Sequence, residues 1–291
     1  MSDIRTLASQ MPFWIQVTRL DRPVGWIVLL WPTWIALTLA SFKAGAFNLG
    51  IWVIFTLGVI ITRSAGCVVN DLTDRKFDKH VKRTKTRPIT TGNLPVKDAV
   101  ILAVVLLLIA FGLVLQTNAE TVYLSFIALG LAVLYPWLKR ITFWPQIGLG
   151  LAFSMAIPMA FTAYRQPLDA LVWALFAGNV AWTLAYDTLY AMVDRDDDLR
   201  IGVKSTAIVF GRYDLVAIGF CQLIALTAFA YTFWLAQLNP FAIFGVIGAA
   251  GFAVQHQWIA KSRARDVCFR AFIENHRFGA ALFVGAVLGS L

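Results

Sequence analysis

The sequence has few charged residues for its length of 291, because Asp, Glu, Lys and Arg make up only 14% of it. Soluble globular chains carry about 25% charged residues, so this composition excludes an ordinary soluble domain. Cysteine and histidine are also scarce, at three residues each. The three cysteines are widely spaced and odd in number, which argues against a disulfide framework or a thiolate metal site. Nothing near the N-terminus is typical of a cleaved signal peptide.

Apolar residues account for 59% of the chain and occur in long runs. A membrane-spanning helix needs roughly 20 such residues, so the runs predict an all-α polytopic membrane protein that forms one domain over residues 1–291. Eight spans are an alternative to nine, because the last run is cleanly apolar only from Phe278 to Leu291. The nine predicted spans are 24–42, 48–69, 99–117, 121–138, 142–164, 168–187, 214–236, 239–260 and 270–291.

The basic residues indicate the orientation of these spans. Of the 25 Lys and Arg residues, 21 fall in the N-terminal segment and in the loops on one side. Only Lys43 and Arg165 lie in the opposite loops. By the positive-inside rule the basic side is cytoplasmic, which places the N-terminus on the cytoplasmic side of a bacterial inner membrane. The net charge of +9 therefore reflects topology and is no evidence for nucleic acid. Residues 1–22 form an amphipathic segment expected on the membrane surface.

Two groups of acidic residues lie on this same side, at the ends of the second and sixth predicted spans. Their spacings of four and seven residues place each group on one stripe of a helix that continues out of the membrane. We call these stripes the two carboxylate rows. The first row comprises Asn70, Asp74 and Asp78, and the second comprises Asp187, Asp194 and Asp198.

Rows of carboxylates repel one another unless a cation holds them together. Hard oxygen ligands suit Mg²⁺, which completes its shell with phosphate oxygens and water. The rows therefore predict a magnesium site for a diphosphate, to which Asp71 adds a further candidate ligand beside Asn70. Surface ion pairs such as Asp71–Arg75 are the plainer interpretation of one such group. The recurrence of the pattern four spans apart, on the same side, argues against that interpretation.

Several basic residues around the rows are candidates for binding substrate. Arg63 lies within a span, seven residues before Asn70, and a charge inside a span indicates function by default. Arg140 could pair through both guanidinium nitrogens with the carboxylate of an aromatic acid, or it could hold a diphosphate. Positive-inside topology alone is the alternative for most of the set, and a structural or snorkelling role is the alternative for Arg63. The candidates are Arg22, Arg63, Lys85, Arg87, Lys139 and Arg140.

The rows and several flanking stretches resemble the UbiA superfamily of intramembrane prenyltransferases. The resemblance covers nearly the whole chain and includes Arg19–Gly25, Arg63–Asp71, Thr86–Ile89 and Cys268–Phe272. The stretches Tyr135–Arg140 and Gly202–Thr206 are most similar to its 4-hydroxybenzoate branch. The resemblance implies a bundle of nine helices around a central cavity that opens to the cytoplasmic side.

The same resemblance implies a reaction. In the lipid bilayer a polyprenyl diphosphate would donate its prenyl group, with Mg²⁺ present, to 4-hydroxybenzoate at the carbon beside the hydroxyl, in ubiquinone biosynthesis. We expect Asp187 or Asp194 to polarise the acceptor hydroxyl and Tyr190 to hydrogen-bond beside the metal site. A naphthoate, homogentisate or haem acceptor is the alternative among enzymes. A cation transporter is the alternative outside them, although its carboxylates would be expected near the middle of the membrane.

Overall fold

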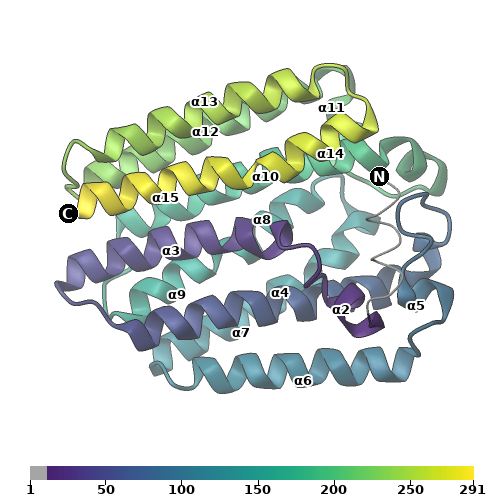
Figure 1. Cartoon of the computed structure of the whole chain (residues 1–291), viewed down its shortest axis with the longest axis horizontal. Coiled ribbons are helices and arrows are strands. Elements are labelled where there is room, and N and C mark those ends of the chain that lie inside the picture. Colours follow the sequence, from purple (N-terminus) through teal and green to yellow (C-terminus); the bar gives the residue numbers. More distant parts are fainter. Residues whose placement is uncertain (1–11) are drawn as a thin grey trace.

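The computed structural model describes residues 12–291, and within them the secondary structure is entirely helical. Residues 1–11, the first half of the expected amphipathic segment, lie outside the described residues. The longer helices run side by side as one bundle (Figure 1). The helices are α2 (Phe13–Thr18), α3 (Val24–Ala44), α4 (Leu49–Asp78), α5 (Pro88–Thr91), α6 (Val96–Val114), α7 (Ala119–Ile141), α8 (Pro145–Ser154), α9 (Ala156–Ala163), α10 (Ala170–Ile201), α11 (Thr206–Phe210), α12 (Asp214–Leu235), α13 (Ala242–Ala260), α14 (Arg265–Glu274) and α15 (His276–Ser290), with a 3₁₀ turn at Gly211–Tyr213.

Three of the long helices begin at the same end of the bundle, each with a polar N-cap side chain. Asn48 accepts a hydrogen bond from the backbone N–H of Ile51 at 3.2 Å, which caps α4. Asn118 and Asp169 cap α7 and α10 in the same way, at 3.0 and 3.1 Å. Such side chains satisfy backbone donors that a helix start leaves unpaired, so the turns before these helices can be short.

In the described part of the chain, seven helical segments are long and apolar enough to cross a membrane, matching the first five, the seventh and the eighth predicted spans. The sixth predicted span falls on α10, which carries Asn179, Thr183 and Asp187, all buried. It is less apolar because it packs inside the bundle against α8, α12 and α14. The ninth predicted span is divided at Asn275 into α14 and α15.

The two helices that carry the carboxylate rows are the longest. The helix α4 has 30 residues and α10 has 32, or about 45 and 48 Å at 1.5 Å per residue. Both are therefore longer than the roughly 30 Å thickness of a bilayer's hydrocarbon layer. Their acidic ends lie among α5, α11 and α14, which gather at the right-hand end of the bundle in Figure 1.

The core around α10 is built from large side chains. The buried Trp182 stacks on Phe278 of α15 with ring centroids 5.3 Å apart. Its indole N–H donates to the Asn275 side chain at 3.3 Å, at the break between α14 and α15. The break therefore has a hydrogen-bonded partner inside the bundle, and α15 is held against the centre.

Close contact between α13 and α15 depends on glycine. A Cβ atom at Gly245 would lie 2.5 Å from the Cα of Gly285 and 2.6 Å from the backbone oxygen of Ala281. Neither backbone atom can move without separating the helices. By contrast, a Cβ at Gly251 on the same helix would meet nothing within 4 Å.

We therefore predict that Gly245→Ala lowers the thermal stability of the purified protein, whereas Gly251→Ala does not. Forcing a methyl group into a packed interface costs about 1–3 kcal/mol. The open position can instead gain from the higher helix propensity of alanine. Thermal unfolding in detergent measures both variants. Equal melting temperatures for the two would contradict the close contact between the helices.

Candidate active site

A cavity of about 1160 Å³ runs into the bundle between α3, α4, α6, α7 and α10. Its deep part is walled by apolar side chains, among them Val28, Phe55, Val59, Leu108 and Phe111. Its other end is polar, because all six residues of the two carboxylate rows line it there. The two rows lie more than 100 residues apart along the chain. The fold nevertheless brings the side chains that the sequence pattern selected to one cavity.

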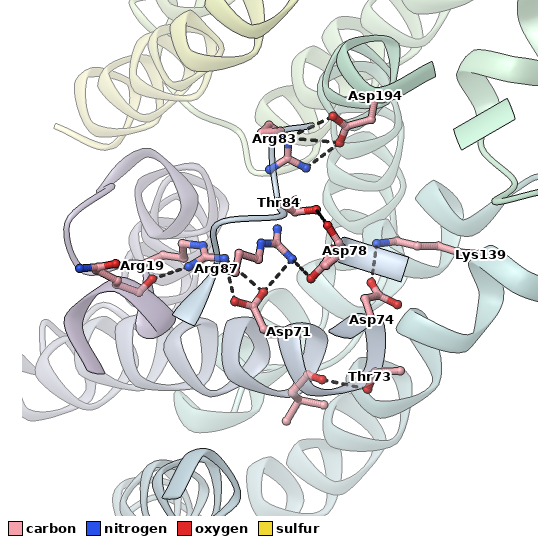
Figure 2. A network of polar contacts seen from close by, with 12 residues as sticks. Arg19, Asp71, Thr73, Asp74, Asp78, Arg83, Thr84, Arg87, Lys139 and Asp194 are labelled. Atoms are coloured by element: carbon pink, nitrogen blue, oxygen red, sulfur yellow. Dashed lines mark hydrogen bonds and ion pairs between the residues drawn. The ribbon is translucent and has the colours of Figure 1, made fainter. Parts of the chain in front are cut away.

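Two arginines pair with Asp78 of the first row and with the adjacent Asp71. The buried Asp71 carboxylate pairs with Arg19 of the segment after α2 and with Arg87, each at 2.8 Å. Arg87 also reaches Asp78 at 2.8 Å, so it bridges two carboxylates that lie two turns apart on one face of α4. Figure 2 shows Arg87 lying between these carboxylates, with Arg19 on the far side of Asp71. Both oxygens of Asp71 are therefore already bound by cations.

Asp74 is held more loosely. Lys139 lies 3.5 Å and Arg140 3.8 Å from its carboxylate. Arg140 donates instead to the backbone oxygen of Thr73 at 3.0 Å. Its guanidinium lies about 5 Å from the ring centroids of both Phe77 and Trp137, which fixes it at the rim of the cavity.

In the second row, Asp194 is paired with Arg83, a residue the sequence interpretation did not single out. Arg83 donates three hydrogen bonds to Asp194, at 2.6, 3.1 and 3.2 Å. Its guanidinium also lies 4.6 Å from the ring centroid of Tyr190. Burial works against the charged form, but Tyr190 and Asp194 more than offset this and raise the pKa of Arg83. The predicted Tyr190 thus contacts the cation that occupies Asp194.

Other oxygens that face the cavity have no cation of their own. The amide oxygen of Asn70 is buried without a hydrogen-bond partner. Among the residues that the structure describes, no ion pair within 4 Å or hydrogen bond reaches the side chain of Asp187 or Asp198. These oxygens are available to a ligand without displacing an arginine.

The donor set fits a hard divalent cation, although the carboxylates are not gathered around one point. In residues 12–291, no three Asp, Glu, His or Cys side chains are close enough together to hold a metal as they stand. Arg83, Arg87 and Lys139 occupy the space between the rows. Oxygen ligands from carboxylates and one amide nevertheless line a single cavity, and the Asn70 oxygen lacks any partner. That chemistry suits Mg²⁺.

Arg63 lies deeper in the cavity than Asn70, Asp74 and Asp78, the row on its own helix. It precedes Asn70 by seven residues, or about 10 Å along α4. Its Nε–H is buried without an acceptor, and its guanidinium lies 5.5 Å from the ring centroid of Phe153. Asp187 precedes Asp194 by the same seven residues on α10, so an unsatisfied cation and a free carboxylate lie at similar depth on two walls.

The two remaining candidates, Arg22 and Lys85, differ in whether they line the cavity. Arg22 lines the cavity, but 64% of its side chain is exposed and it pairs with the neighbouring Asp21 at 3.4 Å. Lys85 is exposed and does not line the cavity, so the structure places it apart from the other candidates. Its neighbours Arg83 and Arg87 point inward. Nothing in a loop so rich in basic residues could have distinguished the inward side chains from the outward ones.

Comparison with known proteins is consistent with this geometry. The UbiA prenyltransferase family matches residues 29–283. A 4-hydroxybenzoate octaprenyltransferase from Tolumonas auensis is 51% identical over 281 residues, which cover 97% of each chain. One from Chromohalobacter salexigens is 50% identical, over 96% of this chain and 93% of its own.

Two solved structures share the fold. The apo structure of a UbiA homolog from Aeropyrum pernix K1 superposes with a TM-score of 0.80 at 22% identity, over 91% of this chain and 98% of that one. A UbiA homolog from Archaeoglobus fulgidus, bound to GPP and Mg²⁺, has a TM-score of 0.71 at 18% identity, over 95% and 100%. The match to the family over most of its length, together with half-identical relatives, shows that this chain belongs to the UbiA prenyltransferase family.

Proposed function

We propose that this protein transfers a polyprenyl group from a polyprenyl diphosphate to the ring carbon of 4-hydroxybenzoate beside the hydroxyl, with release of diphosphate, as a step of ubiquinone biosynthesis. The observation that carries the proposal is the cavity itself. Its long apolar part suits a prenyl chain, and its polar end brings two carboxylate rows together where a diphosphate would lie. The names of the half-identical relatives support the same donor and acceptor.

Five side chains are the proposed ligands of Mg²⁺: Asn70, Asp74, Asp78, Asp194 and Asp198. When bound, the metal would neutralise the charge that develops on the departing diphosphate. We assign Asp71 a different role from the one its position suggested. Arg19 and Arg87 already occupy its carboxylate, so it holds those two cations in place.

The proposed diphosphate ligands of the protein itself are Arg83, Arg87 and Lys139. Each now pairs with a row carboxylate, and each lines the cavity. A guanidinium can bind two phosphate oxygens at once through parallel N–H donors. Burial disfavours the charged form of Arg87, but Asp71 and Asp78 outweigh it and raise the pKa, so Arg87 stays cationic.

The acceptor would lie across the cavity at the depth of Arg63 and Asp187. Arg63 has an N–H with no acceptor, so a carboxylate there would gain a charge-assisted hydrogen bond. Asp187 on the opposite wall is free to accept from the phenolic hydroxyl. This placement favours Arg63 over Arg140 for the carboxylate, because Arg140 already binds Thr73 and two aromatic rings.

The proposed chemical step transfers the prenyl group from diphosphate oxygen to ring carbon. The donor C–O bond breaks, its electron pair leaves with diphosphate, and the aromatic ring supplies the pair for the new C–C bond. The apolar walls exclude the water that would otherwise capture the allylic cation. Asp187 is the better candidate to polarise the hydroxyl and assist loss of the ring proton, because Asp194 is a proposed ligand of the metal and Asp187 has no ion pair among the described residues.

We also propose the membrane arrangement that the sequence favours. Nine spans, with α10 and the α14–α15 pair among them, would place the N-terminus and the polar end of the cavity in the cytoplasm of a bacterial inner membrane. The distribution of basic residues supports this orientation.

Prenyl transfer should require a divalent cation. We expect a protein freed of metal with EDTA, and checked by elemental analysis, to show no turnover until Mg²⁺ is returned. The physical reason is that clustered carboxylates repel a diphosphate unless a metal joins them. Transfer at the full rate in metal-free protein would contradict the proposed ligands.

Asp74→Ala and Asp194→Ala should each lower kcat/KM by about 100-fold or more, the scale for losing a group that stabilises developing charge. Asp98→Ala is the matched control, because Asp98 is exposed near the start of α6 and does not line the cavity. Rates of prenyl transfer by all three purified variants give the comparison. A row variant with the activity of the control would remove that residue from the site.

Arg63→Lys and Arg140→Lys together locate the acceptor carboxylate. Lysine keeps the charge and loses the two parallel N–H donors, which should cost about 1.5–3 kcal/mol, or roughly ten- to a hundred-fold, at the residue that binds it. We expect the KM for 4-hydroxybenzoate to rise in Arg63→Lys far more than in Arg140→Lys. The reverse order of the two effects would move the carboxylate to Arg140 and the rim.

A further inference from the structure

The cations Arg83 and Arg87 reach the cavity from residues 79–87, a nine-residue connection between α4 and α5 that we call the basic segment. It contains turns but no regular helix, and backbone hydrogen bonds such as Lys85 N–H to the Val81 oxygen, at 3.1 Å, shape those turns. The three lysines of the segment, Lys79, Lys82 and Lys85, are exposed. These turns set the local shape of the segment, and contacts with the helices set where it lies against the bundle while its two arginines point inward.

Asp197 of α10 provides such a contact. It is only 8% exposed, yet it does not line the cavity as its neighbour Asp198 does. Its Oδ2 atom accepts a hydrogen bond from the backbone N–H of Lys82 at 3.3 Å. The same oxygen accepts from Nη1 of Arg265, the first residue of α14, at 2.9 Å. One carboxylate thus joins the basic segment, α10 and α14.

We propose that Asp197 is a positioning residue for the proposed prenyl transfer, on which this inference rests. Its carboxylate fixes the backbone of Lys82, and the next residue along the chain is Arg83, which reaches Asp194 and the Tyr190 ring. Arg265 holds the carboxylate in turn, so the anchor does not depend on Lys82 alone. Asp197 touches neither substrate nor metal, and it acts through the placement of Arg83.

The adjacent Asp196 offers a matched control. It also contacts Arg265, at 3.3 Å, but its side chain is 71% exposed and makes no contact with the basic segment. Asp196→Ala therefore removes the same charge one residue away and leaves the anchor intact. Asp197→Asn is the milder second variant, because an amide oxygen can still accept from Lys82 while the charge toward Arg265 is lost.

The experiment uses the full chain in lipid nanodiscs and measures two quantities. The first is the rate at which trypsin cleaves within residues 79–87, followed by mass spectrometry. Loss of a charge-assisted anchor should raise this rate by about ten-fold in Asp197→Ala and by less in Asp197→Asn, with no change in Asp196→Ala. The second is the KM for the prenyl donor, which should rise in the same order while the KM for the acceptor stays constant.

A lower melting temperature with unchanged cleavage and unchanged donor KM would mean that Asp197 is purely structural, and it would overturn the proposal. Equal effects in Asp196→Ala and Asp197→Ala would overturn it as well, because charge alone would then explain them. Failure of the wild-type protein to transfer a prenyl group would refute the proposed function instead. The cleavage rates would still report whether Asp197 holds the basic segment.

Discussion

The structure depends on neutralising carboxylates that stand in rows beside an apolar cavity. Charges a few ångströms apart repel strongly where water is scarce, so nearby cations and hydrogen-bond donors stabilise closely spaced carboxylates. Arg19, Arg83, Arg87 and Lys139 do so for four of the acidic residues. They come from segments outside the two row-bearing helices. The connections around the cavity, and not only its walls, therefore take part in assembling the site.

This arrangement separates the acidic residues by what they contact. Asp71 and Asp197 bind arginines or backbone and fix the surrounding segments. Asp187, Asp198 and the Asn70 oxygen remain free for ligands. Asp78 and Asp194 lie between these extremes, because the arginines they hold are also suited to a diphosphate. We infer that, when the donor binds with its metal, the carboxylates exchange their arginine partners for the metal and the arginines bind the diphosphate. The charges of the carboxylates and of the arginines are therefore neutralised both before and during binding.

The sequence predicted the parts of the molecule that follow from periodicity. Apolar runs located the long helices, and the spacing of Asn70, Asp74 and Asp78 predicted a stripe that α4 carries to its last residue. The sequence did not predict Arg83 or Arg19, because ion-pair partners in a connection depend on where its backbone folds. The break at Asn275 was missed for a similar reason, since its partner Trp182 is 93 residues away. Lys85 was chosen from charge alone, which cannot tell which side of a connection faces inward.

A structure of this protein with Mn²⁺ and an unreactive thio-analogue of the prenyl diphosphate most directly tests whether the two carboxylate rows hold the metal. Anomalous scattering from manganese locates the metal independently of the protein density. We expect manganese between the two carboxylate rows, in contact with Asp74 or Asp78 and with Asp194 or Asp198. We also expect that Arg83 has moved from Asp194 to the diphosphate. Manganese bound elsewhere, or a diphosphate held by arginine and lysine with no metal between the rows, would contradict the proposed metal site.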